Sequence, residues 1–192
     1  MRIIAGQAKG TRLTGLKNSW VRPTLDRVRE TLFNILGQDF SGEFFLDWFG
    51  GSGAVGIEAL SRGVEKVVWV ENNIQAQKII YANLKKCRFW NGDDESQCSN
   101  WVLLKMDALQ AVSVLREMSF QFDTIYMDPP FADDLYEECL ATLSRSQLLK
   151  LSSLVVVEHH HKNALQKFYG KLQLKDGRRV GDTCLSFYSL KG

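Results

Sequence analysis

The sequence has no apolar run near the roughly 18 residues that a membrane-spanning helix needs, and its start lacks the apolar core of a secretory signal. Cysteine is scarce: its four copies form neither CxxC pairs nor the spacing of a disulfide framework. We expect free thiols in a reducing cytoplasm, with a local Cys87–Cys98 disulfide as the alternative. A strong net charge is absent too, because 24 basic and 22 acidic residues among 192 leave +2. The remaining composition, 45% hydrophobic and 24% charged, is that of a globular domain and excludes a disordered, collagen-like or coiled-coil chain.

Positive charge is concentrated at the start of the chain. Residues 1–31 contain seven basic and two acidic side chains, which gives this segment a net charge of +5 against −3 for the remainder. Such a segment favours contact with a polyanion, although a basic surface that only faces solvent is equally consistent with the count. The candidate contacts are Arg2, Lys9, Arg12, Arg22, Arg27 and Arg29.

From residue 43 onward, apolar segments of strand length alternate with segments of helical periodicity, which is typical of a parallel sheet covered on both faces. We expect a doubly wound Rossmann-like α/β sheet of seven strands that ends in an antiparallel hairpin with Asp176-Gly177 and Gly181 in its turn. A small β-hairpin and helix extension precedes it, and we place the domain boundary between residues 1–22 and 23–192. The expected strands are 44–49, 66–71, 101–106, 122–127, 154–158, 171–175 and 183–190. The expected helices are 25–36 (capped by Thr24), 54–62, 74–86, 108–118, 133–150 and 164–169.

A glycine-rich segment lies at the first strand-to-helix junction, where residues 51–56 match the pattern GxGxxG. Glycines there let the backbone turn tightly and approach a ligand, and the following helix N-terminus offers free N–H groups. Glu71 ends the next strand about 20 residues later, where a carboxylate can accept hydrogen bonds from ribose hydroxyls. This combination favours a nucleotide-type cofactor over a turn that serves packing alone, without identifying the cofactor. Asp107 lies one strand further on, where it can accept from an adenine amino group, cap the helix at 108–118, or do both.

The segment Asp128-Pro129-Pro130-Phe131 follows the strand expected at 122–127. Two prolines remove two N–H donors, so the backbone carbonyls and the Asp128 carboxylate form a set of acceptors beside an aromatic ring. Such a set suits a planar base whose exocyclic NH₂ donates two hydrogen bonds and whose face stacks on the ring. The alternative is a rigid turn in which Asp128 caps the next helix.

Three consecutive histidines, residues 159–161, follow the strand expected at 154–158. Consecutive residues of a strand point to alternating sides, so they converge poorly on one ion. We expect a loop here and no metal site.

The segments Asp-Trp-Phe-Gly-Gly-Ser-Gly (47–53) and Asp-Pro-Pro-Phe (128–131) resemble the cofactor loop and catalytic motif of S-adenosylmethionine-dependent amino-methyltransferases that act on nucleic-acid bases. More narrowly, residues 2–10, 22–30 and 60–63 resemble the bacterial small-subunit ribosomal RNA guanine-N2 methyltransferases, and the likeness runs from residue 1 to about 190. The sequence departs from the family at Trp48 and Gly50, where Leu and Ala are usual, and at Phe131, where Tyr is common. The polar stretch 88–100 is also longer than typical.

This resemblance implies methyl transfer from S-adenosylmethionine to the exocyclic N2 of a guanine in 16S ribosomal RNA. Asp128 and the Pro129 carbonyl would accept the two amino protons, Phe131 would stack on the base, and Pro130 would complete the catalytic motif. The implied cofactor residues are Asp47, Phe49, Gly50, Gly51, Ser52, Gly53, Glu71, Asn72 and Asp107. The basic residues of the first 31 would bind phosphates of the RNA, and removing residues 1–21 is expected to abolish RNA methylation yet spare cofactor binding.

Several alternatives remain open from the sequence. An adenine N6 amino group offers the same donors as guanine N2, and the RNA could be bare or part of an assembling small subunit. A nicotinamide-dependent oxidoreductase would explain the GxGxxG pattern and Glu71, but not the segment 128–131. A non-catalytic RNA-binding module is the third possibility. We expect a cytoplasmic monomer.

Overall fold

The computed structural model describes residues 1–16, 26–37, 39–95, 98–130 and 133–191. Its helices are α1 (Asp26–Leu36), α2 (Ala54–Ser61), α3 (Ile74–Lys86), α4 (Ala108–Glu117) and α5 (Asp133–Arg145). Its strands are β1 (Phe44–Asp47), β2 (Lys66–Val70), β3 (Trp101–Leu104), β4 (Phe122–Met127), β5 (Leu149–His160), β6 (Phe168–Tyr169), β7 (Leu172–Val180) and β8 (Thr183–Leu190).

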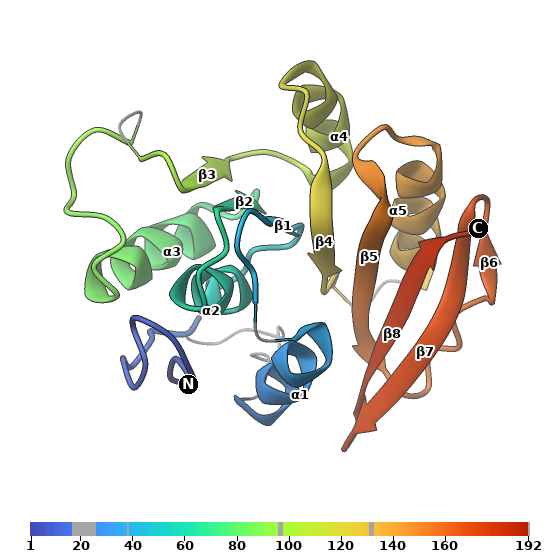
Figure 1. Ribbon diagram of the computed structural model, residues 1–192, viewed down its shortest axis with the longest axis horizontal. Coiled ribbons are helices and arrows are strands. Elements are labelled where there is room, and N and C mark those ends of the chain that lie inside the picture. Colours follow the sequence, from blue (N-terminus) through green and yellow to red (C-terminus); the bar gives the residue numbers. More distant parts are fainter. Residues whose placement is uncertain (17–25, 38, 96–97, 131–132, 192) are drawn as a thin grey trace.

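The strands form one sheet in the order β3-β2-β1-β4-β5-β8-β7-β6 (Figure 1). Strands β1 to β5 pair in parallel, whereas β8 pairs antiparallel with both β5 and β7. This arrangement confirms the predicted doubly wound sheet with its C-terminal antiparallel hairpin. The strand order reverses between β1 and β4, and in such sheets ligands bind in the crevice at the carboxyl ends of the strands beside that switch point.

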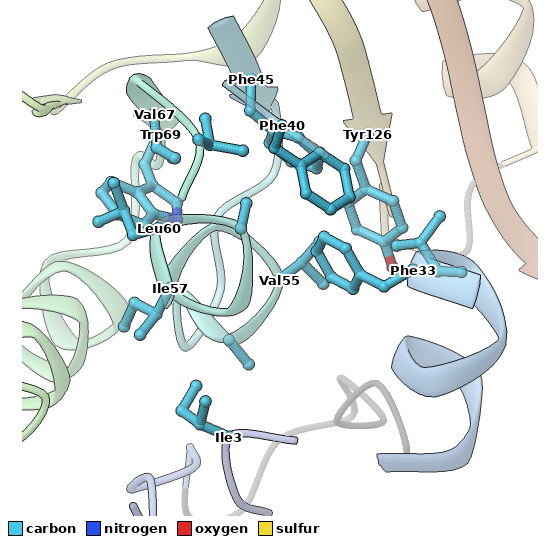
Figure 2. Packing of buried hydrophobic residues seen from close by; sticks show 14 of the residues in the cluster. Ile3, Phe33, Phe40, Phe45, Val55, Ile57, Leu60, Val67, Trp69 and Tyr126 are labelled. Carbon is cyan, nitrogen blue, oxygen red and sulfur yellow. The ribbon is translucent and has the colours of Figure 1, made fainter. Parts of the chain in front are cut away.

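Helices cover both faces of the sheet because the central strands carry apolar side chains on both sides. On one face α1, α2 and α3 pack against strand residues such as Phe45, and on the other α4 and α5 pack against residues such as Leu46 and Ile125. Figure 2 shows the first of these layers, in which the ring of Phe33 lies 5.9 Å from that of Phe40. The two layers hold the strand ends in fixed positions.

The C-terminal third differs from the prediction in three places. Residues 164–169, expected to be helical, contain β6 instead, so the sheet has eight strands rather than seven. Helix α5 ends at Arg145 rather than near residue 150, and β5 is longer than expected because it pairs with both β4 and β8. Gly177 lies inside β7 and pairs with Ser186, so the turn of the hairpin is at Gly181 (φ 66°).

Residues 1–16, the N-terminal arm, fold back on themselves in the manner of the predicted hairpin. One isolated antiparallel bridge joins Arg2 to Arg12, and the backbone N–H of Ile3 donates to the Thr11 carbonyl at 3.0 Å. Ile3 is buried in the same core as α1 and α2 (Figure 2), and so is Leu13. The boundary that we place after residue 22 and the Thr24 cap lie outside the described residues.

All four cysteines are free thiols, as the sequence predicted. Within the described part of the chain, no helix combines the length and the hydrophobicity that crossing a bilayer requires.

Candidate active site

Four carboxylates lie at the carboxyl ends of neighbouring strands, around the switch point of the sheet. Asp47 is the last residue of β1, Glu71 follows β2, Asp128 follows β4, and Glu158 is near the end of β5. In the parallel register, Asp47 pairs with Tyr126 and Met127 pairs with Val157, which places the ends of β1, β4 and β5 at one edge. The structure therefore brings together residues that are more than one hundred positions apart in the sequence.

The glycine loop, residues 50–53, turns the chain from β1 into α2. The N–H of Gly50 donates to the Val70 carbonyl at 3.0 Å, and the N–H of Gly53 donates to the Gly50 carbonyl at 2.7 Å. Gly51 (φ 52°) and Gly53 (φ 75°) adopt left-handed conformations, which favour glycine. A Cβ on Gly50 would lie 3.2 Å from side-chain atoms of Ile80 and Trp69, so this departure from the family pattern fits a closely packed loop.

Glu71 connects the glycine loop to the start of α3. Its Oε2 accepts from the Gly51 N–H and its Oε1 from the Asn73 N–H, both at 2.7 Å. Asn73 caps α3 by accepting from the second and third N–H groups of that helix, while Asn72 is exposed between them. A carboxylate oxygen has more than one lone pair, so each oxygen of Glu71 can accept a further hydrogen bond.

Asp47 is buried beneath the loop, at 1% exposure. Its Oδ2 accepts from the Gly56 N–H at 3.0 Å, which fastens the first turn of α2 to the end of β1. Burial, followed by the nearby charges of Glu71 and Glu158, raises the pKa of Asp47 well above its usual range. Asp47 thus shapes the loop from inside the protein.

Asp107 caps α4, because its Oδ1 accepts from the N–H groups of Leu109 (2.9 Å) and Gln110 (3.2 Å). The helix-cap interpretation is confirmed, and the adenine contact stays a prediction. The indole N–H of Trp48 donates to the carbonyl of Ala108, the first residue of α4, at 2.7 Å. The ring of Phe49 lies 5.9 Å from that of Trp48.

Asp128 is partly exposed at the end of β4, whereas Pro129 is buried and Pro130 is exposed. Burial of the carboxyl group, followed by the charges of Glu158 and Asp47, raises the pKa of Asp128 well above its usual range. Phe131 lies outside the described residues.

Sequence reasoning missed Glu158 and Tyr126. Glu158 is buried, and its Oε2 accepts a hydrogen bond from the Tyr126 hydroxyl across β4 and β5. The signal was present, because Glu158 follows the apolar residues 154–157 just as Glu71 follows 67–70.

The basic candidates do not share one environment. Arg2, Lys9, Arg12 and Arg27 are exposed, and Arg22 lies outside the described residues.

Arg29, by contrast, is fully buried. Its guanidinium donates to the Arg2 carbonyl at 2.5 Å and to Asp26 Oδ1 at 2.9 Å, so it ties the N-terminal arm to α1. This burial departs from the expected phosphate contact, and we leave Arg29 out of the RNA-binding set below.

The three histidines lie at the end of β5 and at the start of the turn that follows it. His159 turns inward, with its Nε2 at 2.8 Å from Ser186 Oγ, whereas His160 and His161 approach Asp182 with potential ligand atoms within 4.8 Å of one another. His160 Nδ1 already accepts from the Lys162 N–H at 3.2 Å, and His161 Nδ1 lies 3.2 Å from the Asp182 carbonyl. His159 and His160 are the last two residues of β5 and His161 begins the following turn, so the expected loop is wrong for the first two histidines. The expectation that consecutive histidines diverge holds for His159 but is wrong for His160 and His161.

Comparison with known proteins identifies the family of the chain. A family model described as Conserved hypothetical protein 95 matches residues 1–189. Ribosomal RNA small subunit methyltransferase D of Haemophilus influenzae is 36% identical over 160 residues, which are 82% of this chain and 78% of the relative. The Escherichia coli protein of the same name is 30% identical over 188 residues, which are 98% of this chain and 89% of the relative. A solved Escherichia coli structure, described provisionally as the methyltransferase yhhF, has a TM-score of 0.80 at 27% identity and covers 100% of this chain and 98% of its own. These matches confirm the resemblance to an rRNA methyltransferase family, and the chain belongs to the family described as Conserved hypothetical protein 95.

Proposed function

We propose that the chain transfers a methyl group from S-adenosylmethionine to the exocyclic N2 amino group of a guanine in 16S ribosomal RNA. The observation that carries this proposal is the position of Asp128 and its two prolines beside the glycine loop at the switch point. The names of the relatives, which are ribosomal RNA small subunit methyltransferases, support RNA as the substrate.

The residues at the strand ends fit a cationic ligand. Glu71 and Asp128 are partly exposed and present carboxyl groups there, whereas Asp47 and Glu158 are buried. A nicotinamide-dependent oxidoreductase would use the glycine loop and Glu71 but would give Asp128 and its two prolines no role, which disfavours it. S-adenosylmethionine, when bound, supplies a reactive methyl group on a positively charged sulfur.

Specific residues would hold this cofactor. Glu71 would accept hydrogen bonds from the ribose hydroxyls, for which its two oxygens have spare lone pairs. Asp107 would accept from the adenine amino group while it caps α4. Gly51, Ser52 and Gly53 would line the binding surface, because side chains are small or absent there.

Asp128 would act on the nucleophile. The guanine N2 lone pair is delocalised into the ring, and acceptance of both N–H groups by Asp128 and the Pro129 carbonyl raises electron density on the nitrogen. Positive charge develops on that nitrogen during transfer, so a fixed carboxylate binds the transition state more strongly than the ground state. As the N–C bond forms, the nitrogen must release one proton. The raised pKa of Asp128 makes its ionised form a stronger proton acceptor than an exposed Asp.

The N-terminal arm, together with Arg22 and Arg27, would position the RNA. Paired RNA hides the amino edge of guanine, so the target base must be unpaired or flipped into the site. Phosphate contacts fix the register of a nucleic acid, while contacts to the base select it. We assign the phosphate contacts to the exposed residues Arg2, Lys9, Arg12 and Arg27 and to Arg22, and base selection to residues 128–131.

The test is transfer of labelled methyl groups to three substrates: deproteinised 16S ribosomal RNA, isolated 30S particles and duplex DNA. Mass spectrometry of the nucleosides identifies the modified base. N2-methylguanosine in either RNA substrate is the expected product, and the comparison shows whether bare RNA or the assembled subunit is preferred. N6-methyladenosine as the only product would replace guanine by adenine in the proposal. A chain that binds S-adenosylhomocysteine yet labels none of the three would contradict the enzymatic function. Monomeric state and cytoplasmic location stay predictions of the same proposal.

A further inference from the structure

Asn83 of α3 joins two parts of the protein that are distant in sequence. Its side chain is fully buried, its Oδ1 accepts from the Thr14 N–H at 2.8 Å, and its Nδ2 donates to the Thr14 carbonyl at 2.9 Å. The same Nδ2 donates to the Ser52 carbonyl at 2.9 Å. One amide group therefore links the N-terminal arm to the glycine loop.

The Ser52 carbonyl is a sensitive point of that loop. It lies between Gly51 and Gly53, which both adopt left-handed conformations, and it is the acceptor through which Asn83 holds the loop. Fixing the Ser52 carbonyl therefore fixes the direction of the peptide units that would face the cofactor. On the arm side, the partner of Asn83 is Thr14, two residues after the exposed Arg12.

The arm is also held to α2 at several points, so it does not behave as a loose tail. Buried Glu58 accepts from the N–H groups of Ile4 (2.8 Å) and Ala5 (3.0 Å). Ser61 accepts from the N–H of Ala8 at 2.9 Å. These contacts attach residues 4–8 to the helix that begins at the glycine loop, so the arm meets the loop region through α2 as well as through Asn83.

We infer that Asn83 is a positioning residue that couples the N-terminal arm to the glycine loop, so that RNA and cofactor strengthen each other's binding. The inference rests on the proposed function. RNA phosphates that hold the arm would reduce its motion, and the Asn83 amide would then hold the Ser52 carbonyl more firmly for the cofactor. If one ligand has already ordered the arm and the loop, the second ligand binds without the entropic cost of ordering them. The inference replaces our expectation that loss of residues 1–21 spares cofactor binding.

The experiment measures the dissociation constant of labelled S-adenosylhomocysteine by equilibrium dialysis, with and without saturating deproteinised 16S ribosomal RNA at constant salt. For the wild-type chain we expect RNA to tighten binding at least about 5-fold, the lower end of typical couplings. Linkage requires that the cofactor product tighten RNA binding by the same factor. For Asn83→Ala the ratio of the dissociation constant without RNA to that with RNA should fall to about one.

Two further variants separate coupling from folding. Asn83→Asp keeps the size and the Oδ1 acceptor but removes the Nδ2 donor to the Ser52 and Thr14 carbonyls. It should also bring the ratio of the dissociation constants to about one, and it serves if the alanine variant does not fold. Lys86→Met is the matched control, because Lys86 on the same helix donates to Thr14 Oγ1 at 2.6 Å, whereas the hydrogen bond to the Ser52 carbonyl comes from Asn83. It should retain the wild-type ratio. Thermal unfolding of each variant reports on folding separately.

A wild-type ratio near one would overturn the inference, as would Asn83 variants that fold and retain the wild-type ratio. Hydrogen exchange at Gly51 to Gly53 in the wild-type chain gives an answer that needs no variant: RNA should slow it, and unchanged exchange with RNA bound would count against the coupling. A chain that binds neither ligand contradicts the proposed function itself. A chain that binds both independently contradicts only this inference.

Discussion

Replacing Glu58 by Gln tests how strongly one buried carboxylate contributes to holding the N-terminal arm on the main domain. Oε2 of Glu58 accepts from Ile4, and Oε1 accepts from Ala5 and from Arg62 Nε, the last at 2.8 Å. The Glu58 side chain is 0% exposed and that of Arg62 is 9% exposed, so solvent screens this ion pair little. Glutamine keeps one acceptor oxygen and places an NH₂ donor where the second oxygen was. The groups that face this side chain are two backbone N–H groups and the Arg62 guanidinium, which can only donate.

The magnitude follows from these contacts. Breaking a buried ion pair by neutralising one partner costs about 3–5 kcal/mol, because the other charge stays buried. With a urea m-value of about 2 kcal/mol/M, the unfolding midpoint should fall by about 1.5–2.5 M. Hydrogen exchange at the Ile4 and Ala5 amides should accelerate at the same time.

Glu117→Gln is the matched control, because Glu117 is an exposed glutamate at the end of α4. It should change the free energy of unfolding by less than about 0.5 kcal/mol. A midpoint for Glu58→Gln that matches this control would refute the assignment of Glu58 as the anchor of the arm.

Three further outcomes are expected. Gly56→Ala should destabilise the chain by about 1–3 kcal/mol in thermal unfolding, because the new Cβ would lie 2.4 Å from Trp69 Nε1, whereas the same change in an open helix stabilises. The pKa of Asp128 is raised in the folded chain, so the folded state binds the proton of this carboxyl group more tightly than the unfolded state does. The resulting contribution to the free energy of unfolding is present at acidic pH and is lost as the pH rises through the folded pKa. Asp128→Asn should therefore match the wild type in urea unfolding near pH 4 and exceed it at pH 8; equal curves throughout would contradict the raised pKa. Replacing Lys9 and Arg12 together by Ala should lower the slope of log RNA affinity against log salt by about two. An unchanged slope would remove both side chains from the phosphate contacts.

The central sheet was predictable because its strands are buried on both faces and separated by helices. Its C-terminal part was less so, since β6 and the length of β5 depend on pairing with β7 and β8, and pairing partners are not a local property of sequence. The relation between the glycine loop and Glu71 was predictable, because both follow strands that are neighbours in a doubly wound sheet.

The roles of Arg29 and Asn83 depend on their positions on the buried faces of their helices. In α1 the buried residues are Val28, Arg29, Leu32 and Phe33, so Arg29 lies on the apolar stripe at the spacing i, i+3, i+4. The sequence analysis weighed its charge and not its place on that stripe. Asn83 lies on the buried face of α3 in the same way. Its partners become apparent only once the arm and the glycine loop are folded against that helix.

The most direct test of the account is the single-turnover rate of methyl transfer to 16S ribosomal RNA by Asp128→Asn, measured beside its affinity for S-adenosylhomocysteine. If the Asp128 carboxylate accepts the amino protons and stabilises charge in the transition state, the rate should fall by about 100-fold or more while the dissociation constant changes less than about 2-fold. A folded variant that transfers methyl groups at the wild-type rate would contradict the assignment of this carboxylate as the acceptor of the reacting amine.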